Sequence, residues 1–261
     1  MKISMYQVDA FASEVFRGNP AAVCVLDKWL DDAVLQNIAA ENNLAETAFF
    51  IKTDEGYDLR WFTPAVEIDL CGHATLASAY VIFEFLEPEL REVSFNTMSG
   101  PLDVTIDAAQ RLSMNFPSRA PKQIAITDLH RDAFGLEPLE VWQSRDLLVM
   151  LESEDKIKQL DANLSKIAEI TDSFAVIATA KGDEVDFVSR FFAPNAGIPE
   201  DPGTGSAHCT LVPFWAEKLG KQTLHAKQLS PRGGELFCEN KGERVAMSGY
   251  ATLFMKAEIY L

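Results

Sequence analysis

Three short segments of the chain combine residue types that can carry out acid–base chemistry. The first contains Glu46 in a mostly apolar stretch, where loss of solvation is expected to raise a carboxyl pKa toward the range useful for proton transfer. The second is Cys71-Gly72-His73, and the third is Asp201-Pro202-Gly203-Thr204-Gly205-Ser206. Each segment also has a purely structural interpretation. Glu46 would be an ordinary strand residue, the second segment a helix start with a buried Cys, and the third a capped turn.

The second segment precedes an apolar run that we expect to be a helix. Cys71 would then lie where the helix N-terminus stabilises a thiolate. His73 at the helix start would tend to be neutral and able to exchange a proton near pH 7. Gly72 allows the backbone to approach a ligand closely.

The second and third segments belong to a passage that occurs twice. In each copy a strand-like run leads through Phe-x-Pro and a Gly-containing turn into an apolar run, as in 62–74 and 192–207. A helix N-terminus carries unpaired N–H groups and a partial positive charge, which suits a carboxylate. The duplication therefore predicts two lobes whose helix N-termini face one cleft.

Strand patterns surround these segments and predict an α+β fold. Apolar helices are expected at 74–85 and 207–219, each preceded and followed by alternating strand-like runs. We expect a duplicated two-lobe fold in which each lobe is a mixed, barrel-like sheet wrapped around a central apolar helix. Two prolines at Pro117 and Pro121 place the boundary, giving lobes 1–117 and 118–261, and the last strand can cross back to the N-terminal lobe.

Composition narrows the classes of partner. The net charge is −16, from 23 Lys and Arg against 39 Asp and Glu, which argues against nucleic acid and anionic membranes. No apolar run approaches a membrane span, and no signal-peptide pattern is present, so a cytoplasmic protein is expected. The four cysteines form no CxxC pair, so disulfides are not expected.

Other catalytic classes lack their motifs. The Cys and His spacings match no common zinc pattern, so no metal site is expected. Neither a G-x-S-x-G elbow nor a P-loop or dinucleotide fingerprint is present, which argues against a serine hydrolase and against nucleotide cofactors.

The chain resembles the phenazine-biosynthesis PhzF-like isomerase family, within the diaminopimelate-epimerase-like fold superfamily. The resemblance runs nearly end to end, and its most specific segments are 8–11, 16–23, 44–49, 62–74, 144–146, 189–207, and Gln228 through Gly234. It implies an active site between two similar lobes, a homodimer, and an isomerase that acts on a small carboxylate without a cofactor. Glu46 matches the catalytic acid/base, while His73 and Asp201 match polar residues around the reacting carbon. Gly72-His73 and Gly205-Ser206 match the N–H groups that hold a substrate carboxylate.

The chain departs from the epimerases of that superfamily at the second helix start. Those enzymes use a second Cys there, whereas this chain has Asp201-Pro202, which disfavours a symmetrical two-thiol racemase. Cys71 resembles the first epimerase thiol and is a further candidate site residue. The isomerase has two alternatives. One is a Cys71-dependent epimerase or racemase, and the other is a non-catalytic carboxylate-binding protein.

Overall fold

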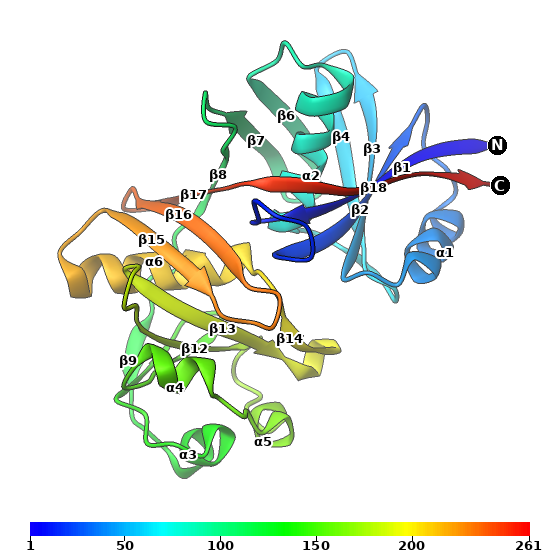
Figure 1. Cartoon of the computed structure of the whole chain (residues 1–261). Helices are drawn as coiled ribbons and strands as arrows, with labels where there is room; N and C mark the ends of the chain where they lie inside the picture. Colours follow the sequence, from blue (N-terminus) through cyan, green and yellow to red (C-terminus); the bar gives the residue numbers. More distant parts are fainter. The chain divides into compact units, whose positions relative to one another are not determined.

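The computed structural model describes residues 1–261, and the chain divides into two compact units. Unit 1 comprises Met1–Asn115 together with Ser248–Leu261, and unit 2 comprises Phe116–Met247. The C-terminal strand thus belongs to the same unit as the N-terminal strand, and the two chain ends lie side by side (Figure 1). None of the helices combines the length and apolar character that a membrane crossing requires.

Unit 1 is built on a mixed sheet. Its order is β18–β1–β2–β3–β4–β6–β7–β8, with parallel pairing only at β2–β3 and β4–β6 and with the short β5 against β4. The strands are β1 (Lys2–Ala10), β2 (Asn19–Leu26), β3 (Glu46–Thr53), β4 (Gly56–Phe62), β5 (Glu67–Ile68), β6 (Glu92–Thr97), β7 (Gly100–Ile106), β8 (Leu112–Pro117) and β18 (Ala251–Tyr260).

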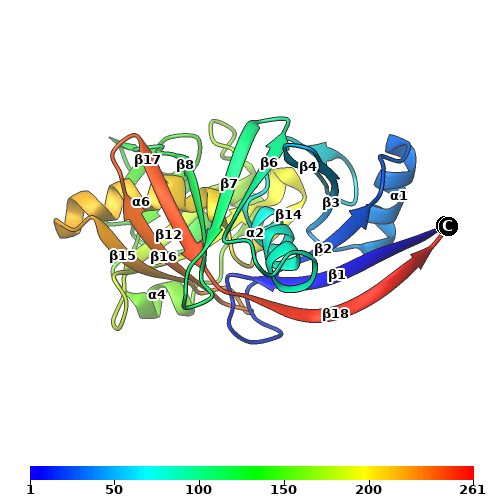
Figure 2. The same ribbon diagram turned by 90° about the horizontal axis from the view of Figure 1, so that it is seen from above.

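The sheet of unit 1 curves around the helix α2 (Gly72–Val81), which contacts β1, β2 and β3 (Figures 1 and 2). Nearly every side chain of α2 is buried, as its almost wholly apolar sequence predicts. The helix begins two residues before the predicted Ala74 and continues as a π-helix, η1 (Ile82–Leu86). The other helix, α1 (Asp32–Asn42), covers the outer face, where Leu35 and Ile38 pack against β2 side chains.

Unit 2 repeats the order of parallel and antiparallel strand pairings found in unit 1. Its sheet runs β9–β10–β11–β12–β13–β15–β16, with parallel pairing at β11–β12 and β13–β15, and β14 lies against β13. The strands are β9 (Lys122–Ile124), β10 (Glu140–Gln143), β11 (Leu147–Met150), β12 (Val176–Lys181), β13 (Phe187–Ala193), β14 (Ile198–Asp201), β15 (Thr223–Gln228), β16 (Gly234–Asn240) and β17 (Arg244–Gly249); the 3₁₀ turn η2 (Pro194–Ala196) precedes β14.

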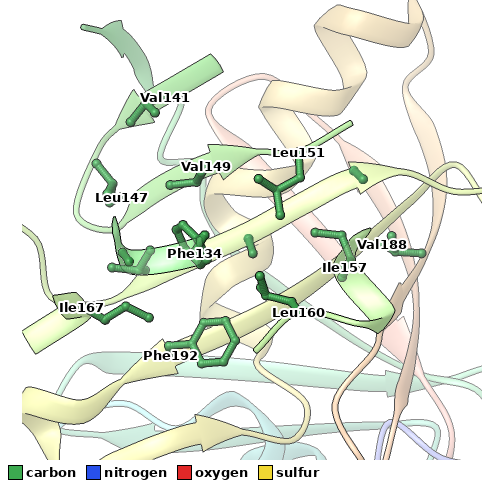
Figure 3. Packing of buried hydrophobic residues seen from close by; sticks show 14 of the residues in the cluster. Phe134, Val141, Leu147, Val149, Leu151, Ile157, Leu160, Ile167, Val188 and Phe192 are labelled. Atoms are coloured by element: carbon green, nitrogen blue, oxygen red, sulfur yellow. The ribbon is translucent and has the colours of Figure 1, made fainter. Parts of the chain in front are cut away.

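Helices cover both faces of the unit 2 sheet. On one face lie α3 (Asp128–Phe134), α4 (Glu154–Lys158) and α5 (Leu164–Ala168), whose apolar side chains meet Phe192 and other sheet residues (Figure 3). On the other lies α6 (Gly205–Leu219), where Trp215 stacks on Phe187 and donates to the Thr179 hydroxyl at 2.9 Å. The strand and helix patterns had not predicted α3. Its signal is a capping box between Thr127 and His130, with His in place of the usual Glu or Gln.

An ion pair marks the duplication. In unit 1, Arg60 on β4 makes two hydrogen bonds to Glu67 on β5, at 2.6 and 2.8 Å. In unit 2, Arg190 on β13 makes the same pair of bonds to Glu200 on β14, also at 2.6 and 2.8 Å. Each pair fixes the short strand that leads toward a buried helix. We call each of these ion pairs, together with the two strands it joins, the frame of that helix start.

Candidate active site

Glu46 and Asn19 lie at the same end of two neighbouring strands in unit 1. Glu46 is the first residue of β3 and Asn19 is the first of β2, and these strands pair in parallel with Ala21 opposite Glu46. Both side chains are buried, Glu46 with 7% exposed. Gly18 precedes Asn19 with φ of +62°, and a Cβ there would lie 2.1 Å from the Ala10 carbonyl oxygen. Only glycine therefore fits this approach to β2.

The start of α2 brings a buried imidazole against these strands. Cys71 is the N-cap in an extended conformation, and His73 is the second helical residue. The His73 Nε2 lies 3.0 Å from Oε2 of Glu46, and its Nδ1 lies 3.2 Å from the Asn19 amide nitrogen. The Cys71 sulfur is 3.5 Å from the same Nδ1. Glu46, Cys71 and His73, all predicted candidates, thus meet in one cluster.

Sequence reasoning missed Asn19. Its segment Gly18-Asn19-Pro20 contributed to the family resemblance, but no chemical role followed from an amide so far from His73 along the chain. The available signal was the pair of strand-starting polar residues, Asn19 and Glu46, on neighbouring parallel strands. Using that signal requires the strand pairing to be known.

The electrostatics of this cluster correct two expectations. Burial raises the pKa of the Cys71 thiol, as does the Glu46 carboxylate, and the contact with His73 only partly offsets them. Cys71 is therefore held as a thiol, not as the expected thiolate. Burial lowers the pKa of His73, but Cys71 and Glu46 outweigh it, so that the pKa lies well above 6.5. The expectation that the helix N-terminus keeps His73 neutral is wrong because a carboxylate contacts the ring directly.

The same three side chains have the composition of a metal ligand set. One ligand atom each from Glu46, Cys71 and His73 lies within 4.8 Å of the others. Both ring nitrogens of His73 already contact protein groups, however, with Glu46 at Nε2 and Asn19 at Nδ1. A bound cation would have to displace one of these contacts and a thiol proton, so the arrangement fits proton transfer better.

In unit 2, Asp201 is fixed by hydrogen bonds. A carboxylate oxygen of Asp201, the last residue of β14, accepts a hydrogen bond from the Thr204 hydroxyl. Gln228, fully buried at the end of β15, accepts from the Thr204 backbone N–H at 2.8 Å and donates to the Asp201 carbonyl at 2.6 Å. This clamp holds the turn between Asp201 and Thr204 in one conformation.

Asp201 and its neighbour Glu200 have different partners. Glu200 is engaged by Arg190, as described above, and is thereby part of the frame. The sequence presents two adjacent carboxylates before the Gly-x-Gly turn, and the structure gives them different roles. Strand alternation is the reason, because successive side chains point to opposite faces.

His208 and Cys209 lie in α6, about one turn beyond the helix start. His208 is fully buried, its Nδ1 lies 2.9 Å from the Thr204 carbonyl oxygen, and burial lowers its pKa to about 4. His208 is therefore neutral near pH 7, with Nδ1 donating. Burial raises the pKa of Cys209 to about 11, so this thiol stays protonated and is a poor substitute for an epimerase thiol.

Both helix starts leave their backbone without a side-chain cap. Neither Cys71 before α2 nor Thr204 before α6 makes an N-cap hydrogen bond through its side chain. Thr204 is therefore not an ordinary N-cap, because its hydroxyl donates to the Asp201 carboxylate. The hydroxyl oxygen of Ser206 lies 3.5 Å from a guanidinium nitrogen of Arg145, which donates to it. Each helix start retains the backbone character of a carboxylate-binding element.

Comparison with known proteins identifies relatives along the whole chain. A family profile described as phenazine biosynthesis-like protein (PhzC-PhzF) matches residues 8–257. An uncharacterized isomerase of Pseudomonas aeruginosa is 47% identical over 262 residues, covering 100% of both chains. A crystal structure of a PhzF-family phenazine biosynthesis protein from Enterococcus faecalis superposes with a TM-score of 0.98 at 49% identity, covering 100% of both chains.

A more distant structure extends the likeness of the fold. A hydroxyproline epimerase from Agrobacterium vitis matches 100% of this chain and 93% of its own, with a TM-score of 0.66 and 9% identity. Together with the PhzF-family structure, it supports the predicted duplicated α+β fold. At that identity the epimerase is informative about the fold alone.

Proposed function

The chain belongs to the phenazine biosynthesis-like PhzC-PhzF family, and from that premise we propose that it isomerises a small carboxylate by moving a proton between two carbons. The observation that carries the proposal is the buried contact between the Glu46 carboxylate and the His73 imidazole at an uncapped helix start. A carboxylate in buried contact with an imidazole can accept and return one proton.

The proposed reaction begins when the substrate carboxylate binds the backbone N–H groups of Gly72 and His73. Glu46 removes a proton from a nearby carbon, so a C–H bond breaks and its electron pair moves into an adjoining unsaturated system. The helix N-terminus stabilises the negative charge that develops toward the carboxylate. Glu46 then returns the proton to another carbon of the same system, which restores the enzyme and leaves the substrate's oxidation level unchanged.

Asp201, Gly205 and Ser206 complete the proposed set of site residues. Support comes from the family resemblance and from the uncapped start of α6, which has the same backbone character as that of α2. The clamp by Thr204 and Gln228 would give Asp201 a fixed orientation toward a ligand. A fixed carboxylate suits orientation of substrate, whereas Glu46 has the partner needed for proton transfer.

The proposal also includes a homodimer and a reaction that needs no cofactor, both implied by the family resemblance. An internal proton shift requires no oxidant or reductant, which is consistent with catalysis by side chains alone. Light scattering during gel filtration measures the mass of the particle. Elemental analysis and absorbance of active protein test whether a metal or organic cofactor copurifies with activity.

Proton exchange tests the proposed chemistry directly. The protein is incubated in D₂O with a panel of amino, hydroxy and cyclic unsaturated carboxylates, and deuterium incorporation at carbon is followed by NMR. Glu46→Gln should abolish exchange. Cys71→Ser changes the group next to Nδ1 of His73, opposite the nitrogen that contacts Glu46, and as the matched control it should retain exchange. Nearly full activity of Glu46→Gln would exclude the mechanism.

One alternative rests on a specific contact. The Cys71 sulfur lies 3.5 Å from the His73 Nδ1, so His73 could in principle accept a thiol proton as in a Cys71-dependent epimerase. The raised pKa of the thiol opposes this use. Exchange lost in Cys71→Ser and kept in Glu46→Gln would select the epimerase. Ligand-induced NMR shifts without exchange, for every carboxylate, would favour a binding protein.

A further inference from the structure

His73 is the central group of the buried cluster, and three chain segments contact its ring. Glu46 approaches Nε2 from β3, at 3.0 Å, and Asn19 approaches Nδ1 from β2, at 3.2 Å. Cys71 approaches Nδ1 from the helix start at 3.5 Å. A neutral imidazole carries one proton, so these neighbours decide which nitrogen holds it.

The hydrogen-bonding capacity of each neighbour is limited. The Asn19 amide nitrogen only donates, and an ionised carboxylate only accepts. With the amide nitrogen of Asn19 facing Nδ1, Nδ1 must accept, and the one proton of a neutral ring must lie on Nε2, the nitrogen 3.0 Å from Oε2 of Glu46. The Cys71 thiol is compatible with this arrangement, because S–H is also a donor toward Nδ1.

We propose that Asn19 is a positioning residue that keeps the remaining ring proton on Nε2, the nitrogen that faces Glu46, once His73 loses its charge. This inference deepens the proposed function and, as far as catalysis is concerned, rests on it. The Nε2 side of the ring then lies against Oε2 of Glu46, at 3.0 Å, and Oε1 is left to receive the substrate proton.

The site's construction makes this role specific to Asn19. The side chain is fully buried and begins β2 next to Gly18, whose close approach to the Ala10 carbonyl admits no Cβ. Among the groups that perturb His73, only Glu46 on β3 and Cys71 at the start of α2 are titratable, and β2 contributes the uncharged amide. A donor at Nδ1 also repels a second ring proton, so Asn19 opposes the imidazolium that Glu46 favours.

NMR of the histidine side chains reads the proton position without reference to activity. The chain has four histidines, so protein labelled with ¹⁵N-histidine gives a small set of ring signals, and His73→Asn identifies those of His73. Above the pH at which the ring loses its charge, we expect long-range ¹H–¹⁵N correlations to show the proton on Nε2. A proton on Nδ1 in the native protein would overturn the inference, with no variant required.

Asn19→Asp provides the converse test. A carboxylate at this position accepts from Nδ1–H, so the proton should move to Nδ1 and His73 should stay charged to higher pH. Asn96→Asp makes the same chemical change at an exposed position of β6 and should leave the His73 signals unchanged. An unmoved His73 signal in folded Asn19→Asp protein contradicts the proposal.

Activity separates this inference from the proposed function. Once an exchanging carboxylate is known, Asn19→Asp should slow exchange by about 100-fold or more, the lower end of general acid–base contributions, and move its pH profile to higher pH. If native protein exchanges no substrate but shows the Nε2 proton, the proposed function fails and the assignment of Asn19 stands. If native protein exchanges substrate but Asn19→Asp has an unchanged rate and pH profile, the inference fails instead.

Discussion

The starts of α2 and α6 share a frame but hold different polar groups. At α2, the titratable side chains Glu46, Cys71 and His73 lie in mutual contact. At α6, Asp201 is tied to Thr204 and Gln228, and the buried His208 is neutral. Duplication therefore preserved the machinery that presents a helix N-terminus, while the two copies diverged in acid–base character. One copy is suited to moving a proton and the other to holding a fixed orientation.

The largest expected effect comes from removing the carboxylates of the two copies in turn. Glu46→Gln should slow proton exchange by roughly 10²- to 10⁴-fold, because it removes the group that carries the proton. Asp201→Asn should cause a smaller loss, since an amide can still take part in the clamp with Thr204. Exchange rates at saturating substrate measure both. Equal losses would contradict the division of roles between the copies.

The two buried histidines should contribute to stability in opposite pH ranges. The pKa of His208 falls from 6.5 to about 4, so the unfolded chain takes up a proton that the folded state refuses, and stability is lost as pH falls from about 6.5 to 4. The interval corresponds to roughly 3 kcal/mol. The pKa of His73 is raised, so its contribution is complete below pH 6.5 and is lost as pH rises through the folded-state value.

Urea unfolding as a function of pH measures this difference. His208→Asn, which keeps a donor toward the Thr204 carbonyl, should flatten the acid side of the stability profile. His73→Asn should flatten the neutral-to-alkaline side. Identical changes in the two variants would show that the pKa directions assigned to these residues are wrong.

Backbone binding of a carboxylate at each helix start predicts a contrast between proline and alanine. Cys71 and Thr204 are extended, so proline can follow at Gly72 or Gly205, the first helical positions, and removes one N–H. Loss of a hydrogen bond to a charged group should weaken substrate binding roughly 10- to 100-fold. Gly72→Ala and Gly205→Ala keep the N–H and serve as controls. Titration of an exchanging carboxylate distinguishes the pairs, and equal weakening by Ala and Pro would argue against backbone binding.

The smallest effects are expected in the shared frame. Glu200→Gln leaves Arg190 without a charged partner, with one amide oxygen and backbone carbonyls as acceptors, and should destabilise by about 1.5–3 kcal/mol. Glu67→Gln should cost less than about 1 kcal/mol, because Arg60 keeps its ion pair with the exposed Asp32 at 2.9 Å. Denaturant unfolding gives both values. A greater loss from Glu67→Gln would reverse the predicted order of the two copies.

The sequence alone went far in predicting the fold and part of the site. Hydrophobic periodicity placed the two apolar helices, and the repeated Phe-x-Pro passage predicted the duplication that the strand pairings of both units display. Glu46, Cys71 and His73 were singled out from residue type and context. These features are local, because propensity, capping and spacing along the chain determine them.

Only the tertiary structure decided which polar groups meet and in what charge state. Asn19 reaches His73 because β2 and β3 pair in parallel and α2 packs against them, and Gln228 reaches Thr204 because β15 pairs in parallel with β13. Burial and a contacting carboxylate then overrode the helix dipole at His73 and Cys71. Local sequence specifies the elements, whereas the partner and pKa of a buried side chain depend on contacts between segments distant in the chain.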